Sequence, residues 1–175
     1  MPLDHLWATW RSAYVGQVVD TRELPDPAEA GGRSLFERIL TAADEEGDEA
    51  AGVLWRGKAC FALINRYPYT AGHLMVLPNR AVADLEDLTD DEFSELWAAV
   101  RDAVVALKAA FRCDAVNVGL NLGPAAGGSQ SDHLHVHCVP RWEGDANFMS
   151  VTAETRVLPI PLDEAAARIR AAWPT

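Results

Sequence analysis

Three histidines at alternating positions constrain this chain more than any other feature of its sequence. His133, His135 and His137 are separated by single apolar residues and followed by further β-formers. Polar and apolar residues that alternate in this way are typical of a half-buried β-strand. All three imidazoles would then leave the same face, spaced by roughly 6.6–6.8 Å. The sequence predicts a strand through these histidines that ends at Pro140, which cannot supply a ladder hydrogen bond.

Three imidazoles on one face need a chemical reason. A single histidine on a strand is usually a packed or surface residue, but three in register would sacrifice apolar burial unless each found a hydrogen-bond partner or a ligand. Neutral imidazoles can hold zinc or copper. Alternatively, one imidazole is a nucleophile and its neighbours position a phosphate, since a pKa near 6.5 leaves a neutral nitrogen available at cellular pH. The spacing leaves both alternatives open.

Composition limits the class of protein. The chain has 175 residues, 49% of them hydrophobic, which suffices for one domain with extensions. No run approaches about 18 consecutive apolar residues, so we expect no membrane partner. The first residues lack the basic and apolar regions of a secretion signal, and we expect a cytoplasmic protein.

Charge and cysteine content exclude further classes. A net charge of −11 makes a nucleic-acid partner improbable, because that binding requires neutralisation of phosphates by Lys and Arg. A small anionic substrate is compatible with this charge if backbone N–H groups and a few cations face it. Cys60, Cys113 and Cys138 form no close pair, which argues against a disulfide framework.

The N-terminal residues differ in pattern from the rest of the chain. Residues 1–15 have apolar residues at helical spacing and predict an amphipathic arm that packs on its own domain or on another subunit. Residues 19–33 are rich in Pro, Gly, Asp and Glu, as in a linker. We therefore divide the chain into an arm and linker, 1–33, and a domain with a C-terminal extension, 34–175.

Within that domain, hydrophobic periodicity and turn residues predict both helices and strands. Thr89 and Glu92 form a capping-box pattern that opens a long helix, whose apolar stripe from Phe93 to Phe111 we interpret as core. We expect helices over 34–43, 89–111 and 163–173, an exposed acidic segment over 44–49, and strands over 53–56, 59–64, 73–78 and 114–121.

A loop of glycines and small residues leads into the histidine strand. It runs from Leu122 to Ser129. Such a loop can direct consecutive backbone N–H groups at an anion. Glycine loops are also common turns, but beside three histidines this one is a plausible phosphate cradle.

The histidine strand and its surroundings resemble the histidine triad (HIT) family, whose signature reads here His133-Leu-His-Val-His-Cys-Val139. The likeness covers residues 52–142. Residues 62–78 are similar to the fragile histidine triad branch, and residues 117–123, 126–129 and 140–148 resemble the actinobacterial diadenosine tetraphosphate phosphorylases.

The resemblance implies an α+β fold. Its core would be a five-stranded antiparallel sheet with one long helix and a C-terminal helix, to which this chain adds its N-terminal helical arm. The family forms dimers in which the sheets join, and the phosphorylase subgroup is similar to a tetramer. We therefore expect a homodimer or homotetramer.

The resemblance also implies roles for individual residues. His135 would attack the α-phosphorus of an adenosine nucleotide and form a covalent nucleotidyl-histidine, while His133 and His137 orient the phosphate region. The positions that match substrate-binding residues of the family are Asn65, His73, Asn121, Gly128, Ser129 and Trp142.

The second substrate decides the reaction. With orthophosphate as acceptor, diadenosine tetraphosphate would yield ATP and ADP, and the subgroup likeness favours this phosphorolysis. With water the products would be ATP and AMP, as in a hydrolase of dinucleoside polyphosphates or adenosine phosphoramidates. A nucleotide-binding protein with little turnover is a third hypothesis. Arg66 and Arg141 are nearby cations that could attract the acceptor, or ordinary surface charges.

The chain departs from one family pattern. Many bacterial members hold a structural zinc with a Cys-x-x-Cys pair, a later histidine and the first triad histidine. The aligned positions read Ser34, Glu37 and Ala81 here, which leaves only His133. We therefore expect no metal and no cofactor.

Overall fold

The computed structural model describes residues 33–127, 130–145 and 158–174. The predicted arm and almost all of its linker, together with Gly128 and Ser129, lie outside the described residues. The division of the chain at residue 33 therefore stays a prediction.

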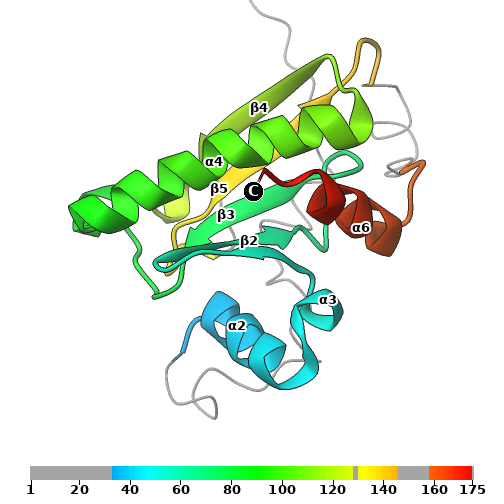
Figure 1. The fold of residues 1–175 in the computed structure, drawn as a ribbon. Helices are drawn as coiled ribbons and strands as arrows, with labels where there is room; N and C mark the ends of the chain where they lie inside the picture. The colour runs from blue at the N-terminus through cyan, green and yellow to red at the C-terminus, as the bar shows by residue number, and fades with distance from the viewer. Residues whose placement is uncertain (1–32, 128–129, 146–157, 175) are drawn as a thin grey trace, which may run out of the picture.

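A five-stranded antiparallel sheet forms the centre of the described structure (Figure 1). Its strand order is β1-β2-β3-β5-β4, so the last strand in sequence lies between β3 and β4. The strands are β1 (Val53–Arg56), β2 (Cys60–Ile64), β3 (Leu74–Pro78), β4 (Ala115–Leu120) and β5 (Val136–Arg141). The α+β class and the five-stranded sheet expected from the sequence are confirmed.

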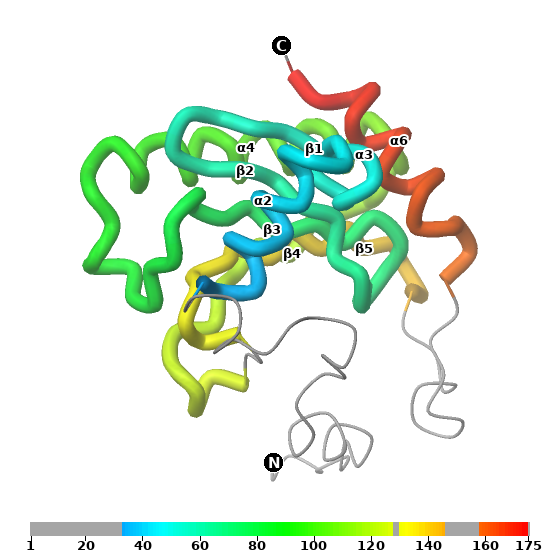
Figure 2. The backbone as a smooth tube through the Cα atoms, turned by 90° about the horizontal axis from the view of Figure 1, so that it is seen from below, coloured from blue at the N-terminus to red at the C-terminus, as the bar shows by residue number. Residues whose placement is uncertain are grey.

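Helices cover both faces of this sheet. The long helix α4 (Asp90–Phe111) crosses one face, beside the C-terminal helix α6 (Leu162–Ala172). Helix α2 (Leu35–Glu46) lies on the opposite face, followed by the short α3 (Asp48–Ala51), as the turned view in Figure 2 also shows. Two 3-10 turns, η1 (Leu85–Asp87) and η2 (Pro124–Ala126), occur in the connections.

Alternation along the strands explains the two layers. In β2, Cys60, Ala62 and Ile64 belong to the apolar cluster beneath α4 and α6, whereas Phe61 and Leu63 belong to the cluster beneath α2. All five are buried. Because successive side chains leave opposite faces, a strand covered on both sides must be apolar at every position.

Both helices that pack across the middle of the sheet begin with a complete capping box. Thr89 caps α4 together with Glu92, as predicted, and Ser34 caps α2 together with Glu37. In each pair the hydroxyl accepts a backbone N–H from the glutamate, whose carboxylate accepts the N–H of the cap residue. The exposed acidic segment is confirmed, but α2 continues through it to Glu46, three residues further than predicted.

The buried stripe of α4 differs in part from the predicted one. Leu96, Val100 and Leu107 are buried as expected, but Phe93 is 45% exposed. Alanines at 99, 103 and 106 occupy the middle of the interface. Small residues allow a close approach of helix and sheet, and a pattern read from large apolar residues alone overlooks them.

Pro140 lies inside β5 and does not end it. The Arg141 carbonyl accepts the Asp114 N–H (2.9 Å), so the backbone groups of Pro140 point to the other side of the strand. There Thr70 Oγ1 donates to the Pro140 carbonyl (2.8 Å). The ladder between β3 and β5 has already ended at Cys138, so no strand partner needs the missing N–H.

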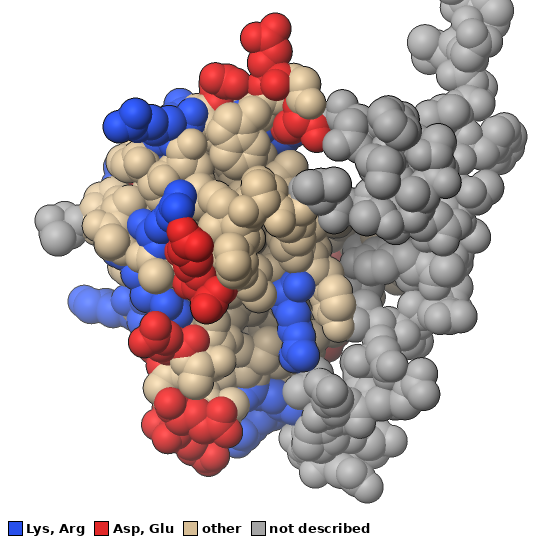
Figure 3. Space-filling model, turned by 90° about the vertical axis from the view of Figure 1, so that its right-hand side faces the viewer, with Lys and Arg blue, Asp and Glu red and all other residues tan. Residues whose placement is uncertain are grey.

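Charges of both signs are mixed on the surface drawn in Figure 3. Among the residues coloured there, Lys and Arg alternate with Asp and Glu and form no broad basic surface. Within the described ranges, no helix combines the length and apolar character needed to cross a bilayer.

Candidate active site

The three histidines come together, but not on one regular strand. His137 lies in β5 opposite Met75 of β3, whereas His133 and His135 precede the strand, which begins at Val136. The predicted strand through all three is therefore wrong. The rings still form one cluster: those of His135 and His137 are 4.9 Å apart, and Phe36 of α2 lies 5.4 Å from both His133 and His135.

Hydrogen bonds fix the tautomer of His133. Its ring is fully buried, with Nε2 2.9 Å from the Pro78 carbonyl and Nδ1 2.7 Å from Ser34 Oγ. Because a carbonyl can only accept, Nε2 carries the proton. Nδ1 of the neutral ring then accepts a hydrogen bond from the Ser34 hydroxyl.

His135 is held in the complementary tautomer. Its Nδ1 lies 2.8 Å from the carbonyl oxygen of His133, so Nδ1 donates. The lone pair of the neutral ring is then on Nε2. A histidine that attacks phosphorus needs this arrangement, in which the second nitrogen is anchored and the first is nucleophilic.

His73 orients the third histidine. The backbone N–H of Tyr69 donates to His73 Nδ1 (3.1 Å), so the proton of the neutral His73 ring is on Nε2. That nitrogen lies 3.0 Å from His137 Nδ1 and donates to it. Neutral His137 therefore has its own N–H at Nε2, where it can serve as a donor to a substrate oxygen.

Burial keeps the three triad rings neutral. Loss of hydration lowers the pKa of His133 and of His135, although hydrogen bonds to backbone carbonyls oppose the effect. Burial, with a further contribution from His135, lowers the pKa of His137 to about 4. The tautomers deduced for the three neutral triad rings therefore apply at neutral pH.

Two of the predicted substrate-binding residues adjoin this cluster. His73 belongs to it directly, and Asn65 Nδ2 lies 3.3 Å from His73 Nδ1. Asn65 also accepts the Tyr67 N–H through Oδ1 (2.9 Å). Asn65 is half-buried, and its amide borders the histidine cluster through this contact with His73.

The other predicted residues are placed differently. Asn121 is half-buried just after β4, and the ring of Trp142 packs edge-on against Phe111, 6.5 Å away. Gly128 and Ser129 lie outside the described residues.

Arg141, which the sequence suggested as a cation for the acceptor, is engaged elsewhere. Its guanidinium donates to both carboxylate oxygens of Asp145 (2.6 and 2.7 Å) and to Asn117 (2.8 Å). Arg141 therefore acts as a brace for the turn after β5, and its charge is already paired.

The sequence pattern missed Gly119 in β4. Gly119 pairs directly with His137, so their side-chain positions share a face of the sheet. A Cβ at Gly119 would meet no atom of the described residues within 4 Å. A glycine inside a strand, next to open space rather than close packing, often marks the approach of a ligand. That glycine, three residues before the predicted cradle, was the available signal.

The positions aligned with zinc ligands do come together, but their chemistry does not fit zinc. Ser34 contacts His133, and Glu37 Oε1 accepts the N–H of Ala81 (3.1 Å). The methyl side chain of Ala81 has no atom that can bind a metal, and at position 34 a hydroxyl replaces a thiolate. Among the described residues no group of three or more His, Cys, Asp or Glu could hold a metal ion.

Comparison with known proteins agrees with the fold. A family model described as the HIT domain matches residues 46–144, and the chain belongs to this family. The chain is 43% identical over 172 residues to the AP-4-A phosphorylase of Mycobacterium tuberculosis, a match that covers 98% of this chain and 85% of that protein.

Two further matches are more distant. An asymmetrical bis(5'-nucleosyl)-tetraphosphatase of Schizosaccharomyces pombe is 38% identical over 93 residues, which cover 53% of this chain and 50% of that protein. The crystal structure of a zinc-bound histidine triad family protein from Mycobacterium smegmatis superposes with a TM-score of 0.60 at 26% identity, over 76% of this chain and 91% of that one.

Proposed function

We propose that this chain is a nucleotidyltransferase that cleaves dinucleoside polyphosphates, with diadenosine tetraphosphate as the substrate, by phosphorolysis to ATP and ADP. The geometry of His135 carries the proposal: its Nδ1 is tied to the His133 carbonyl, which leaves the lone pair on Nε2. The likeness to a relative that is an AP-4-A phosphorylase, over nearly the whole chain, supports the choice of substrate and acceptor.

In the first step, His135 Nε2 forms a bond to the α-phosphorus while the bond from that phosphorus to the bridging oxygen breaks. ATP leaves, and AMP remains on the histidine. In the second step an oxygen of orthophosphate attacks the same phosphorus, the N–P bond breaks and ADP leaves. Both steps spread negative charge over phosphoryl oxygens, so they need aligned donors rather than a strong base.

Several residues would supply those donors. His137 Nε2–H lies within the cluster and would donate to a phosphoryl oxygen. The loop with Gly128 and Ser129 would add backbone N–H groups and a hydroxyl, and Asn121 at the end of β4 a side-chain amide. Asn65 would hold the sugar, and Trp142 would lie near the substrate. No cofactor or metal is required by this chemistry.

Hydrolysis is the alternative. The match to an asymmetrical tetraphosphatase, although it covers only about half of each chain, favours water as a possible acceptor. Product analysis with diadenosine tetraphosphate, with and without orthophosphate, separates the two reactions. ADP formed only with phosphate supports phosphorolysis, AMP in both conditions supports the hydrolase, and absence of turnover supports a nucleotide-binding protein.

We further propose a cytoplasmic homodimer or homotetramer that acts on free nucleotides and not on nucleic acid. Strand β4 is an outer strand of the sheet, and Val118 and Leu122 on and after it are each 41% exposed. An apolar outer strand is suited to join the sheet of a second copy. Light scattering of the purified chain tests this: a monomeric mass at micromolar concentration contradicts it.

A further inference from the structure

Helix α2 is joined to the triad by a continuous series of hydrogen bonds. Ser34 Oγ lies 2.7 Å from His133 Nδ1, and the His133 carbonyl accepts His135 Nδ1–H at 2.8 Å. We propose that Ser34 and Glu37, the capping box of α2, are positioning residues that hold the nucleophile His135 through His133. This inference rests on the proposed function of His135.

The Ser34 hydroxyl is committed in two directions. It accepts the Glu37 backbone N–H (3.2 Å), and it donates to His133 Nδ1, since that nitrogen has the lone pair. Ser34 is 5% exposed and His133 is fully buried, so water cannot easily replace this donor. Without the hydroxyl, the lone pair of His133 would be buried and unsatisfied.

Glu37 extends the series to the loop after β3. One carboxylate oxygen accepts the Ser34 N–H (2.9 Å) and the other accepts the Ala81 N–H (3.1 Å). Burial by itself raises the pKa of Glu37, but the hydrogen bonds from the backbone N–H groups of Ser34 and Ala81 lower it, and the pKa is lowered overall. The carboxylate thus stays charged, which strengthens both hydrogen bonds.

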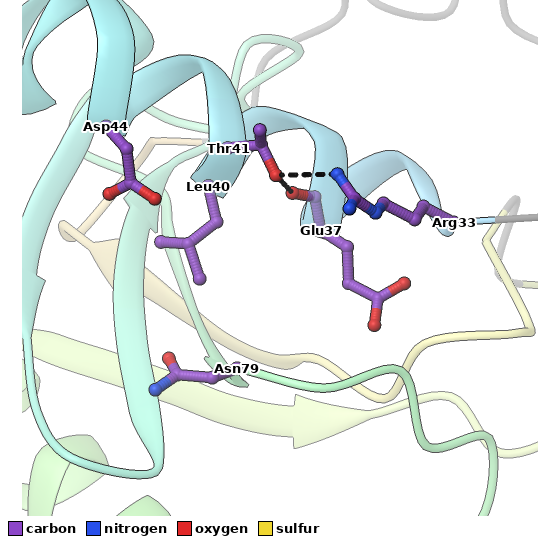
Figure 4. A pocket seen from close by; sticks show the side chains of 6 residues that line it. All are labelled: Arg33, Glu37, Leu40, Thr41, Asp44 and Asn79. Atoms are coloured by element: carbon purple, nitrogen blue, oxygen red, sulfur yellow. Dashed lines mark hydrogen bonds between the residues drawn. The ribbon is translucent and has the colours of Figure 1, made fainter. Parts of the chain in front are cut away.

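Figure 4 shows that the Glu37 carboxylate points away from the Arg33 and Thr41 side chains beside it. Arg33, Thr41 and Asp44 line the same pocket, and Arg33 donates to Thr41, which donates to the Glu37 carbonyl. The Glu37 carboxylate turns away from this pair, toward the loop that follows Asn79. The carboxylate is therefore used by the backbone near His133 and not by the polar surface of α2.

Hydrogen bonds hold the His133 ring from both sides. Its Nε2–H donates to Pro78 at the end of β3, and its Nδ1 is fixed to α2. The ring cannot turn without the loss of both bonds, so the peptide that carries the His133 carbonyl keeps its direction. Phe36 packs on both His133 and His135, which adds a second contact from α2. Nucleophile alignment then depends on a helix cap that itself lies outside the triad.

The second capping box provides a matched control. Thr89 and Glu92 form the same pair of bonds at the start of α4, which packs on the opposite face of the sheet. Ser34→Ala and Thr89→Ala each remove one N-cap hydroxyl, and both should lower Tm. Only Ser34→Ala should lower kcat, by about 10- to 100-fold with KM within about threefold, because orienting hydrogen bonds affect alignment more than binding.

Histidine side-chain ¹⁵N–¹H spectra of the full-length protein give a readout that needs no substrate. We expect Ser34→Ala to change the ¹⁵N chemical shifts of the ring nitrogens of both His133 and His135. Thr89→Ala should leave these chemical shifts unchanged. Unchanged His135 nitrogens in Ser34→Ala, or kcat within twofold of the wild type, overturn the proposal. An equal loss of kcat in Thr89→Ala also overturns it.

If Ser34→Ala fails to fold, a milder change in the same capping box keeps the test decisive. Glu37→Gln keeps the size of the side chain but places an amide N–H opposite the N–H of Ser34 or Ala81. It should lower kcat at least about threefold and shift His135, and unchanged kcat and shifts refute the role of Glu37. The wild-type protein shows separately whether the proposed function fails. Absence of turnover with diadenosine tetraphosphate would refute that function, whereas the spectra still test whether Ser34 and Glu37 position His135.

Discussion

His73 Nε2 donates a hydrogen bond to His137 Nδ1 at 3.0 Å, which gives the last histidine of the triad a defined tautomer. His73 itself is fully buried and held by the Tyr69 N–H. A fourth histidine, 60 residues away from the motif by sequence, thus determines where a triad histidine carries its proton.

We expect His73→Ala to lower kcat by about 10- to 100-fold, because His137 would lose the partner that directs its Nε2–H. KM should change less than kcat. Steady-state kinetics with diadenosine tetraphosphate and phosphate measures both. Thr89→Ala again serves as a control for a general loss of stability, and a variant of His73 with wild-type kcat would contradict the role assigned to this residue.

His135→Ala should lower turnover at least about 1,000-fold, because the atom that attacks phosphorus is removed. The fold should persist, as judged by circular dichroism. Intact-mass spectrometry of a reaction quenched without phosphate should show a wild-type chain heavier by one adenylyl group and an unmodified variant. An unmodified wild type during steady turnover would argue against the covalent step.

Acid should destabilise the protein earlier than its carboxylates alone would. The pKa of the buried triad rings is lowered, to about 4 for His137, whereas unfolded histidines have a pKa of about 6.5. Between these values the unfolded chain binds protons that the folded chain does not, so the free energy of unfolding falls as the pH drops from about 6.5 toward 4.

Urea unfolding at several pH values measures this slope. Above about pH 6.5 the contribution of the histidines is fully present and the curve should be flat. Pairing lowers the pKa of the Glu92 and Asp145 carboxyls to about 2. The stability that these carboxylates contribute is therefore lost in a lower pH range. His137→Gln should reduce the slope between pH 6.5 and 4, and an unchanged slope would assign the effect to other groups.

Gly119→Val should raise KM for the dinucleotide by about 10-fold or more while leaving Tm unchanged or higher. A valine there would fill the space beside His137 that we assign to substrate, and valine favours strands over glycine. Ala115→Val is a matched control, since Ala115 lies on the same strand and face but opposite Arg141, four residue pairs along the ladder from the Gly119–His137 pair. Wild-type KM in Gly119→Val would show that substrate avoids this position.

Much of the fold followed from local patterns. The capping box at Thr89 and the strands predicted over 59–64 and 73–78 each depend on neighbours in the chain, so sequence alone located them. The position of Pro140 did not follow, because a proline ends a strand only if a neighbouring strand needs its N–H. That requirement depends on where β3 stops.

The candidate site was divided in the same way. Three alternating histidines indicated one cluster, and the cluster exists, although only His137 belongs to a strand. The charge of Arg141 suggested a role with the acceptor, but Asp145 and Asn117 already bind it. Which cation is engaged is decided by turns that bring residues together, and composition does not record this.

By itself, the sequence determined which side chains could do chemistry here: imidazoles with lone pairs near neutral pH, next to a loop of glycines. Only the tertiary structure decided which nitrogen of each ring holds the proton. The Pro78 and His133 carbonyls, the Ser34 hydroxyl and the Tyr69 N–H make that choice, and each lies in a different segment of the backbone. The direction of each hydrogen bond depends on which donor or acceptor the folded chain places within about 3 Å of the ring nitrogen. The motif can therefore identify the nucleophilic residue but not the nitrogen that carries its lone pair.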